Sequence, residues 1–209
     1  MVPLTEGTRP RVEGDRELEI LTATLDVLAD LGYDRLTMDA VAAAARASKA
    51  TLYRRWTSKA QLVIDALVSQ KGPLAAPDTG DLRSDLLAMF CGGGGLTDHR
   101  QSAILASVIT AIGRDTEFAE AFRRDFIAPK AQVARQIFQR ASARGEIRDD
   151  LDLDLLAPAL PGIVLHRHFL MGEVPDQDLI ARVIDHVILP AVGLAGGATT
   201  TTTRQKDNS

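Results

Sequence analysis

The residues in this sequence best suited to chemistry are cations, and they lie together in the stretch TMDAVAAAARASKATLYRRWTSK, residues 37–59. Five basic residues and no acidic residue occur between positions 46 and 59, although the chain of 209 residues has a formal net charge of −4. The only Trp and one of the two Tyr residues lie in the same segment. Ammonium and guanidinium groups bind phosphate oxygens, so the segment predicts contact with a nucleic acid. The five basic residues are Arg46, Lys49, Arg54, Arg55 and Lys59.

Two short helices joined by a tight turn are expected to position these cations. Thr37 is a favourable N-cap for the first, Ala-rich helix. Ser48 is the expected N-cap of the second helix, residues 49–56, whose Leu52 and Trp56 lie one turn apart on one face. That face anchors the second helix to a core, and its remaining surface can meet the major groove of DNA. A basic second helix after a tight turn is the helix-turn-helix pattern.

Further helices are expected on both sides of this pair, and the chain as a whole is predicted to be all-α. A Leu stripe over residues 18–28 indicates one helix that ends at Gly32, and Ser58 begins another with the capping-box order Ser-Lys-Ala-Gln. Residues 1–14 contain two Pro and two Gly and are predicted to be a flexible arm. Residues 15–70 are predicted to form a helix-turn-helix DNA-binding domain, which consists of three helices and the helix that begins at Ser58.

The rest of the chain is predicted to be a helical bundle for effector binding and dimerisation, residues 81–192. A broad apolar stripe that includes Ile104, Val108 and Ile109 indicates that its second helix is central. Glycines 92–95 are expected to form a loop, and residues 193–209 lack periodicity and are predicted to be a disordered tail. Helices are expected near residues 81–91, 99–113, 115–127, 129–144, 152–170 and 177–192.

Other kinds of site find little support in the sequence. Cys91 is the only cysteine, which excludes a disulfide and a Cys-based zinc site and fits a reducing compartment. His166 and His168 point to different sides of a helix, which argues against a metal site. The sequence contains no nucleophile–base–acid set of the kind that would indicate an enzyme, and no cofactor is predicted. The chain lacks a signal-peptide core and an apolar run of about 18 residues, so we expect a cytoplasmic protein that makes no membrane contact.

Taken together, the N-terminal features resemble the tetracycline-repressor (TetR) family of one-component transcriptional regulators. The resemblance covers roughly residues 15–70 and is carried by the Leu-rich first helix, Gly32-Tyr33, Leu36-Thr37, Val41-Ala42, Ser48, the segment TLYRRW and Ser58-Lys59. One residue departs from the family pattern, because Arg46 occupies the turn position that is usually Gly. Arg in that position costs about 1 kcal/mol if the turn requires a positive φ.

The resemblance implies a role for each side chain around the second short helix. The groove-facing residues would be Lys49, Ala50, Thr51, Tyr53 and Arg54, and the phosphate contacts Thr37, Tyr53, Arg55 and Lys59. With the N-cap Ser48, these residues make up the expected DNA-binding set. Two alternatives stay open, namely Tyr53 as an ordinary surface-packing aromatic and Arg55 as a solvated charge. Trp56 is expected to be a core residue, and Arg9 and Arg11 either reach a minor groove or belong to the flexible arm.

For the second half of the chain, the resemblance implies a cavity for a small, often hydrophobic effector and a homodimer interface made by the last two helices. Both helices are strongly apolar although they are terminal, and Pro158 and Pro161 are expected to bend the first. The residues expected to line the cavity are Met89, Phe90, Ser107, Val108, Ala111, Phe126 and His166. The residues expected in the interface are Leu156, Leu160, Ile163, Val164, Ile180, Ile184, Val187 and Ile188.

The function expected from these observations is a transcriptional repressor that a small effector releases from a palindromic operator. The effector would shift the helix at about residues 58–71, which links the cavity to the DNA-binding helices. One alternative is an all-α enzyme or small-molecule-binding module that is similar only at its N-terminus; turnover of a bound compound would identify it. The other is a constitutive DNA-binding protein with no effector, which a packed core without a pocket would favour.

Overall fold

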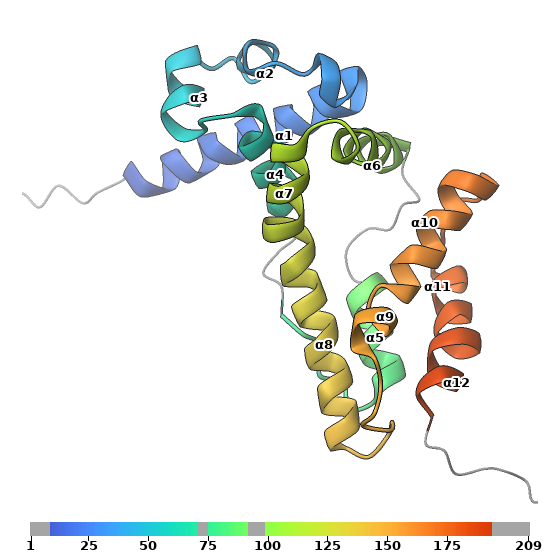
Figure 1. The fold of residues 1–209 in the computed structure, drawn as a ribbon. Helices are drawn as coiled ribbons and strands as arrows, with labels where there is room; N and C mark the ends of the chain where they lie inside the picture. Colours follow the sequence, from blue (N-terminus) through green and yellow to red (C-terminus); the bar gives the residue numbers. More distant parts are fainter. Residues whose placement is uncertain (1–8, 71–74, 92–98, 194–209) are drawn as a thin grey trace, which may run out of the picture.

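A computed structural model of the chain describes residues 9–70, 75–91 and 99–193, and all regular elements in these ranges are helical, as predicted (Figure 1). The loop expected at 92–95 and all but the first residue of the expected tail lie outside the described residues. The helices are α1 Arg9–Arg35, α2 Met38–Ala44, α3 Lys49–Arg55, α4 Lys59–Ser69, α5 Leu82–Cys91, α6 His99–Ile112, α7 Thr116–Phe122, η1 Arg123–Ile127, α8 Ala128–Ala143, α9 Leu153–Leu156, α10 Ala159–Met171, α11 Gln177–Val183, η2 Ile184–Ile188 and α12 Leu189–Val192.

The first helix begins earlier than the sequence predicts. Residues 9–14 belong to α1, so this part of the predicted flexible arm is wrong, whereas residues 1–8 lie outside the described residues. The main helix is interrupted at Gly32, as expected, where the backbone has φ 74° and ψ 164°. Such a conformation suits Gly because it has no Cβ, and the chain continues for one short turn to Arg35.

The three predicted N-caps of the helix-turn-helix region are confirmed. The side-chain oxygens of Thr37, Ser48 and Ser58 accept hydrogen bonds from backbone N–H groups in the first turns of α2, α3 and α4. The capping box is only half formed, since Gln61 accepts weakly from the backbone N–H of Thr57 at 3.4 Å instead of reaching Ser58. Local side-chain chemistry therefore sets these helix starts.

Two long helices of the second half each contain a π-helical segment. In Figure 1, α7, η1 and α8 follow one another as a single long column, and α11, η2 and α12 form a shorter one. Pro129 and Pro190 each lie two residues after the π segment, at the start of α8 and α12. Proline lacks an N–H and its ring clashes with the carbonyl four residues earlier, which explains why the preceding turn is widened. The predicted bend near Pro158 is also present, as the break between α9 and α10.

A first hydrophobic core joins the DNA-binding region to two helices from the second half of the chain. It combines α1–α4 with Ile104 and Val108 of α6 and Phe118 and Phe122 of α7. The core therefore crosses the predicted boundary between residues 15–70 and 81–192. The prediction that α6 is central is wrong, because α6 packs against α1 and α7 and its outer residue Ile109 is 44% exposed.

A second hydrophobic core lies at the other end of the column α7–η1–α8. The remaining helices, α5 and α9 to α12, lie on one side of α8 there, as Figure 1 shows, and α5 contacts α8, α11 and η2. Its largest buried side chains include Phe138 and Ile137 of α8 and Ile184 and Ile188 of η2. The column consequently carries apolar side chains for both cores, the first with α7 and the second with α8.

Asp85 is a fully buried carboxylate that ties the start of α5 to the end of α8. One of its oxygens accepts hydrogen bonds from the backbone N–H of Thr79 at 2.6 Å and from its hydroxyl at 2.7 Å, and Arg144 donates to the other at 3.4 Å. Burial alone disfavours the charged form, but the bonds from Thr79 and the cation of Arg144 outweigh it and hold the pKa of Asp85 below its ordinary value.

Replacement of Asp85 by Asn should destabilise the protein by about 1–3 kcal/mol at pH 7, because a buried network would lose its charged acceptor. The lowered pKa in the folded state means that ionised Asp85 stabilises the fold above its unfolded pKa of about 3.9 and loses this effect as the pH falls through the folded value. Urea unfolding of both proteins should therefore show a constant difference from pH 7 to about pH 5 that shrinks below about pH 4. An undiminished difference at about pH 3 would contradict this role.

Candidate DNA interface and effector pocket

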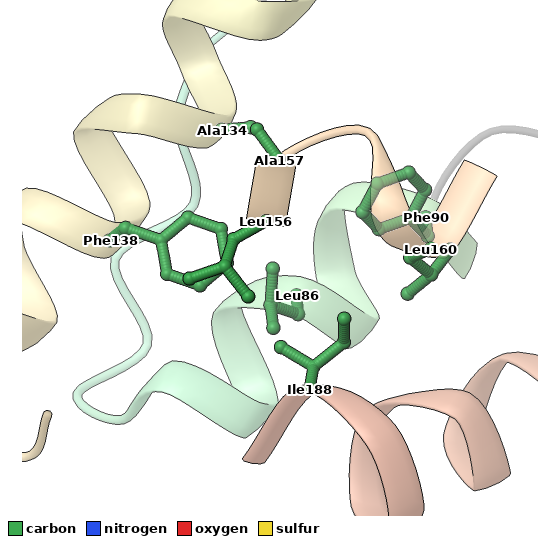
Figure 2. A pocket seen from close by; sticks show the side chains of 8 residues that line it. All are labelled: Leu86, Phe90, Ala134, Phe138, Leu156, Ala157, Leu160 and Ile188. Carbon is green, nitrogen blue, oxygen red and sulfur yellow. The ribbon is translucent and has the colours of Figure 1, made fainter. Parts of the chain in front are cut away.

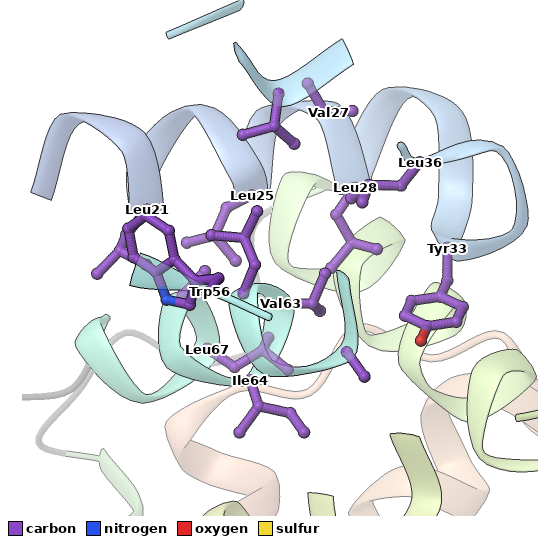
Figure 3. Packing of buried hydrophobic residues seen from close by; sticks show 14 of the residues in the cluster. Leu21, Leu25, Val27, Leu28, Tyr33, Leu36, Trp56, Val63, Ile64 and Leu67 are labelled. Atoms are coloured by element: carbon purple, nitrogen blue, oxygen red, sulfur yellow. The ribbon is translucent and has the colours of Figure 1, made fainter. Parts of the chain in front are cut away.

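Helix α3 is anchored by its inner face. Leu52 is fully buried and Trp56, just after the helix, is 1% exposed, which confirms its prediction as a core residue. Figure 3 shows the Trp56 indole packed near Leu21 and Leu25 of α1. Its ring N–H donates to Asp65 of α4 at 2.9 Å, so the polar end of the indole is satisfied inside the core.

The outer face of α3 is open to solvent. Tyr53 is 55% exposed, a position that is open to DNA and that also suits a surface-packing aromatic. Thr51 is half-buried, and its hydroxyl lies 2.8 Å from that of Ser48. The exposed members of the expected DNA-binding set are Thr37, Ser48, Lys49, Ala50, Tyr53, Arg54 and Arg55.

Two cations of this face are paired with carboxylates from other helices. Lys49 Nζ lies 2.6 Å from Asp39 of α2, and Arg55 lies 2.9 Å from Glu17 of α1. The hydrogen bond from Lys49 to Asp39 raises the pKa of the ammonium, which remains charged at neutral pH. Both pairs are solvent-exposed and hence weak enough for DNA phosphates to compete with them.

The remaining cations of the expected DNA-binding set, Arg54 and Lys59, differ in exposure and in their hydrogen-bond partners. Arg54 is exposed and makes no hydrogen bond or ion pair within the described ranges. Lys59 is half-buried instead of fully exposed, and its ammonium donates to the backbone carbonyl of Tyr33 at 3.1 Å. The sequence revealed the cations but not their partners Asp39, Glu17 and Tyr33, because only the folded chain brings α1, α2, α3 and α4 together.

Arg46 adopts the strained turn conformation that its position demands. Its φ of 50° is the only positive value at a non-glycine residue in the described ranges. The guanidinium of Arg16 in α1 donates to the carbonyl of Ala45 at 2.9 Å and to that of Arg46 at 2.7 Å. These two charge-assisted bonds stabilise the turn and offset the conformational cost of about 1 kcal/mol. The turn therefore keeps its geometry without glycine.

The residues expected to line an effector cavity are not brought together. Val108, Ala111 and Phe126 pack in or against the first core, and Ser107 lies beside them, where its hydroxyl donates to the carbonyl of Leu28 at 3.3 Å. Met89 and Phe90 pack against the second core, and His166 is exposed on α10. The prediction of one cavity lined by these seven residues is therefore wrong.

A small apolar pocket does occur in the second core, between α5, α8, η2 and the α9–α10 segment. Figure 2 shows its side chains pointing toward one another from these elements. It has room for little more than one water molecule. Of the residues expected to bind an effector, only Phe90 lines it. The lining residues are Leu86, Phe90, Ala134, Phe138, Leu156, Ala157, Leu160 and Ile188.

The predicted interface residues are mostly core residues. Five of the eight are buried within the chain itself, so their assignment to an exposed dimer surface is wrong, while Leu156 and Ile163 are half-buried and Val187 is 44% exposed. Helix α5 packs against α11 and η2, and α10 packs against both, which the sequence of the last two helices alone could not show. The apolar surface that remains open includes Leu170 at the end of α10. The five buried residues are Leu160, Val164, Ile180, Ile184 and Ile188.

Within the described ranges, no cluster of three or more His, Cys, Asp or Glu side chains is arranged to bind a metal ion. The helices of those ranges are also too short or too polar to cross a lipid bilayer.

Comparisons with known proteins agree with this geometry. Residues 20–66 match the family described as "Bacterial regulatory proteins, tetR family", and residues 76–187 match the family "Tetracyclin repressor-like, C-terminal domain". The first match contains α2, α3 and most of α4, and the second contains α5 to most of η2.

Individual relatives are similar over nearly their whole length. The chain is 38% identical to the uncharacterised HTH-type transcriptional regulator Rv1556 of Mycobacterium tuberculosis, over 91% of this chain and 94% of that protein. It is 35% identical to the DNA-binding transcriptional repressor TetR of Mycobacteroides abscessus, over 83% and 92%. The crystal structure of the TetR family transcription regulator SCO0332 superposes with a TM-score of 0.65 at 32% identity and covers 85% of this chain and 98% of that one. The chain therefore belongs to the tetracycline-repressor (TetR) family of bacterial transcriptional regulators, and it is a DNA-binding transcriptional regulator.

Proposed function

We propose that this chain represses transcription as a homodimer that binds a palindromic DNA operator, and that a small hydrophobic effector releases it. The observation that carries the proposal is the division of α3 into two faces. Leu52 and Trp56 fix the helix to the core, while Lys49, Tyr53 and Arg54 are left exposed on the outside. A helix held in this way can enter a major groove without losing its packing.

The proposed contacts divide into two groups. Lys49 and Arg54, with Ala50, Thr51 and Tyr53, would read base edges, because they lie on the outer part of α3. Thr37, Arg55 and Lys59 lie around the ends of the neighbouring helices and would bind phosphates, together with the hydroxyl of Tyr53. Ser48 would hold the N-terminus of α3 in place. Phosphate contacts fix orientation, and base contacts supply sequence preference.

The proposed effector site is the apolar pocket of the second core. Its lining offers no charged side chain, so an uncharged, hydrophobic molecule fits its chemistry. A molecule larger than water must widen the pocket, and binding then favours the widened state over the present one. The column α7–η1–α8 carries Ala134 and Phe138 of the pocket, and α7 and η1 contact α4. Widening the pocket would therefore displace α4, the helix that follows α3.

The proposal assigns DNA binding to residues 15–70 and effector binding and dimerisation to residues 81–192. It places the protein with the bacterial chromosome in the cytoplasm. No step of this activity requires a cofactor, a metal or a membrane.

Selection of bound duplexes from a random DNA pool tests the proposed operator binding. A two-fold symmetric dimer presents two copies of α3, so the recovered sites should be inverted repeats with a fixed half-site spacing. Binding should also weaken steeply with salt, since phosphate contacts release counterions. Recovery of an unrepeated site, or of no enriched sequence, would contradict the proposal.

The dimer can be tested with charges placed on the apolar surface that stays exposed. Leu170→Glu combined with Val187→Glu should weaken dimerisation at least about tenfold, because two-fold symmetry brings each new charge near its copy. Sedimentation velocity over a micromolar concentration range measures the change. Ile109→Glu is a matched control, since Ile109 is exposed by the same 44% as Val187 but lies on α6. Equal effects of the two proteins would contradict an interface made by the last helices.

A further inference from the structure

Three helices meet at Tyr33, which is 4% exposed and follows the backbone turn at Gly32. Its hydroxyl donates to a carboxylate oxygen of Asp115 at 2.7 Å, across 82 positions of sequence. Its backbone carbonyl accepts from the ammonium of Lys59 at 3.1 Å, and the same ammonium lies 4.2 Å from the centroid of the Tyr33 ring. One residue of α1 thereby connects the first residue of α4 with the residue that precedes α7.

Asp115 is itself held in place by the helix that it caps. Its second carboxylate oxygen accepts from the backbone N–H of Phe118 at 2.9 Å, and the Tyr33 ring packs against the Phe118 ring with centroids 4.6 Å apart. These bonds, first the one from Phe118 and then the one from Tyr33, lower the pKa of Asp115, and the charge of Lys59 adds to the effect. Burial and the neighbouring Asp115 raise the pKa of the Tyr33 hydroxyl, which therefore remains a donor at neutral pH.

The contacts restrict Lys59 more than a surface lysine is usually restricted. A lysine side chain has about 2 kcal/mol of rotamer entropy to lose when it is fixed against a phosphate. In Lys59 the carbonyl and the ring face of Tyr33 already select one arrangement, and the ring is in turn fixed by Asp115 and Phe118. A preorganised cation binds an anion more tightly than a mobile one does, because less entropy is lost.

We propose that Tyr33 and Asp115 are positioning residues for DNA binding: they hold the Lys59 ammonium at the N-terminus of α4 in the arrangement that binds a phosphate. The inference rests on the proposed function, in which Lys59 contacts DNA. It goes further by making this contact depend on Asp115, which lies beyond the helix-turn-helix at the start of α7. A displacement of α7 then changes the affinity for DNA without any change in α3.

The experiment is a set of double-mutant cycles on the duplex recovered by selection, with binding measured at fixed salt. Tyr33→Phe keeps the ring and the carbonyl but loses the bond to Asp115. Asp115→Ser retains a good N-cap but is too short for that bond. Each variant should weaken binding about threefold in the wild-type background and leave it unchanged in the Lys59→Gln background, because the coupling passes through Lys59. Lys59→Gln alone should reduce the salt slope by about 0.9 for each phosphate that the ammonium neutralises in the wild type.

Asp176→Ser is the matched control, because Asp176 caps α11 through the backbone N–H of Leu179 at 2.7 Å and has no contact with α4. It should leave DNA binding unchanged, and thermal unfolding verifies that every variant is folded at the assay temperature. If Lys59→Gln binds like wild type, both the proposed Lys59 contact and the inference fail. If Lys59→Gln weakens binding but Tyr33→Phe and Asp115→Ser act equally in both backgrounds, or tighten binding, the inference alone fails.

Discussion

Protein that carries Lys49→Ala and Arg54→Ala together should bind its selected operator at least about 30-fold more weakly than wild type, because each good contact between a side chain and a base edge contributes about 1–3 kcal/mol and two contacts contribute at least about 2 kcal/mol. Both residues lie on the exposed face of α3, and truncation of either leaves Leu52 and Trp56 in the core. Fluorescence anisotropy with the selected duplex and with a random duplex of equal length measures the loss. The preference between the two duplexes should fall together with the affinity.

A control must remove the same positive charge elsewhere. Arg135, which is half-buried, and Arg148, which is exposed, are cations of the second half of the chain, and each is paired with a carboxylate, as Lys49 is. Arg135→Ala with Arg148→Ala should therefore change operator binding little. Wild-type affinity in the Lys49→Ala/Arg54→Ala protein would show that α3 is not the recognition helix.

Trp56→Ala should destabilise the protein by about 3–5 kcal/mol, as replacement of a fully buried large aromatic usually does. The indole fills space between α1, α3 and α4, and its N–H is the hydrogen-bond partner of Asp65. Urea unfolding followed by circular dichroism measures the loss. Tyr53→Ala, which removes an aromatic that is 55% exposed, should change stability by no more than about 0.5 kcal/mol.

The single Trp also allows a direct measurement on the unmodified protein. Because the indole is 1% exposed, iodide should quench its fluorescence poorly in the folded state and readily in urea. Ready quenching of the folded protein would contradict the buried position. The Trp56 prediction and the α3 prediction are independent, since one concerns the inner face of α3 and the other its outer face.

Features that depend on a few neighbouring residues were predictable from the sequence. The N-caps Thr37, Ser48 and Ser58 are examples, because each hydroxyl bonds to a backbone N–H three residues later. The core position of Trp56 followed from its spacing with Leu52. The ends of the helices predicted near residues 81–91, 99–113 and 177–192 were close to the structure, because Gly residues flank them.

Features that depend on packing between distant segments were not predictable in the same way. Leu160 and Ile184 have the apolar spacing of an interface, but the structure buries them under other helices of the same chain. The periodicity of a helix shows that a face is covered and not which partner covers it. The acidic partners Asp39 and Glu17 lie 10 and 38 positions from the cations that they bind, and no local pattern connects them.

The column α7–η1–α8 has a mechanical consequence. With 1.5 Å of rise for each residue, the helical path from Thr116 to Ala143 is about 40 Å long. Phe118 near one end is embedded in the first core, and Phe138 near the other lines the apolar pocket. A rod of this length is a lever: a tilt of about 5° about one end displaces the other by about 3–4 Å. If an effector tilts the column as proposed, a small rearrangement around Phe138 becomes a larger displacement at the helices that hold α3.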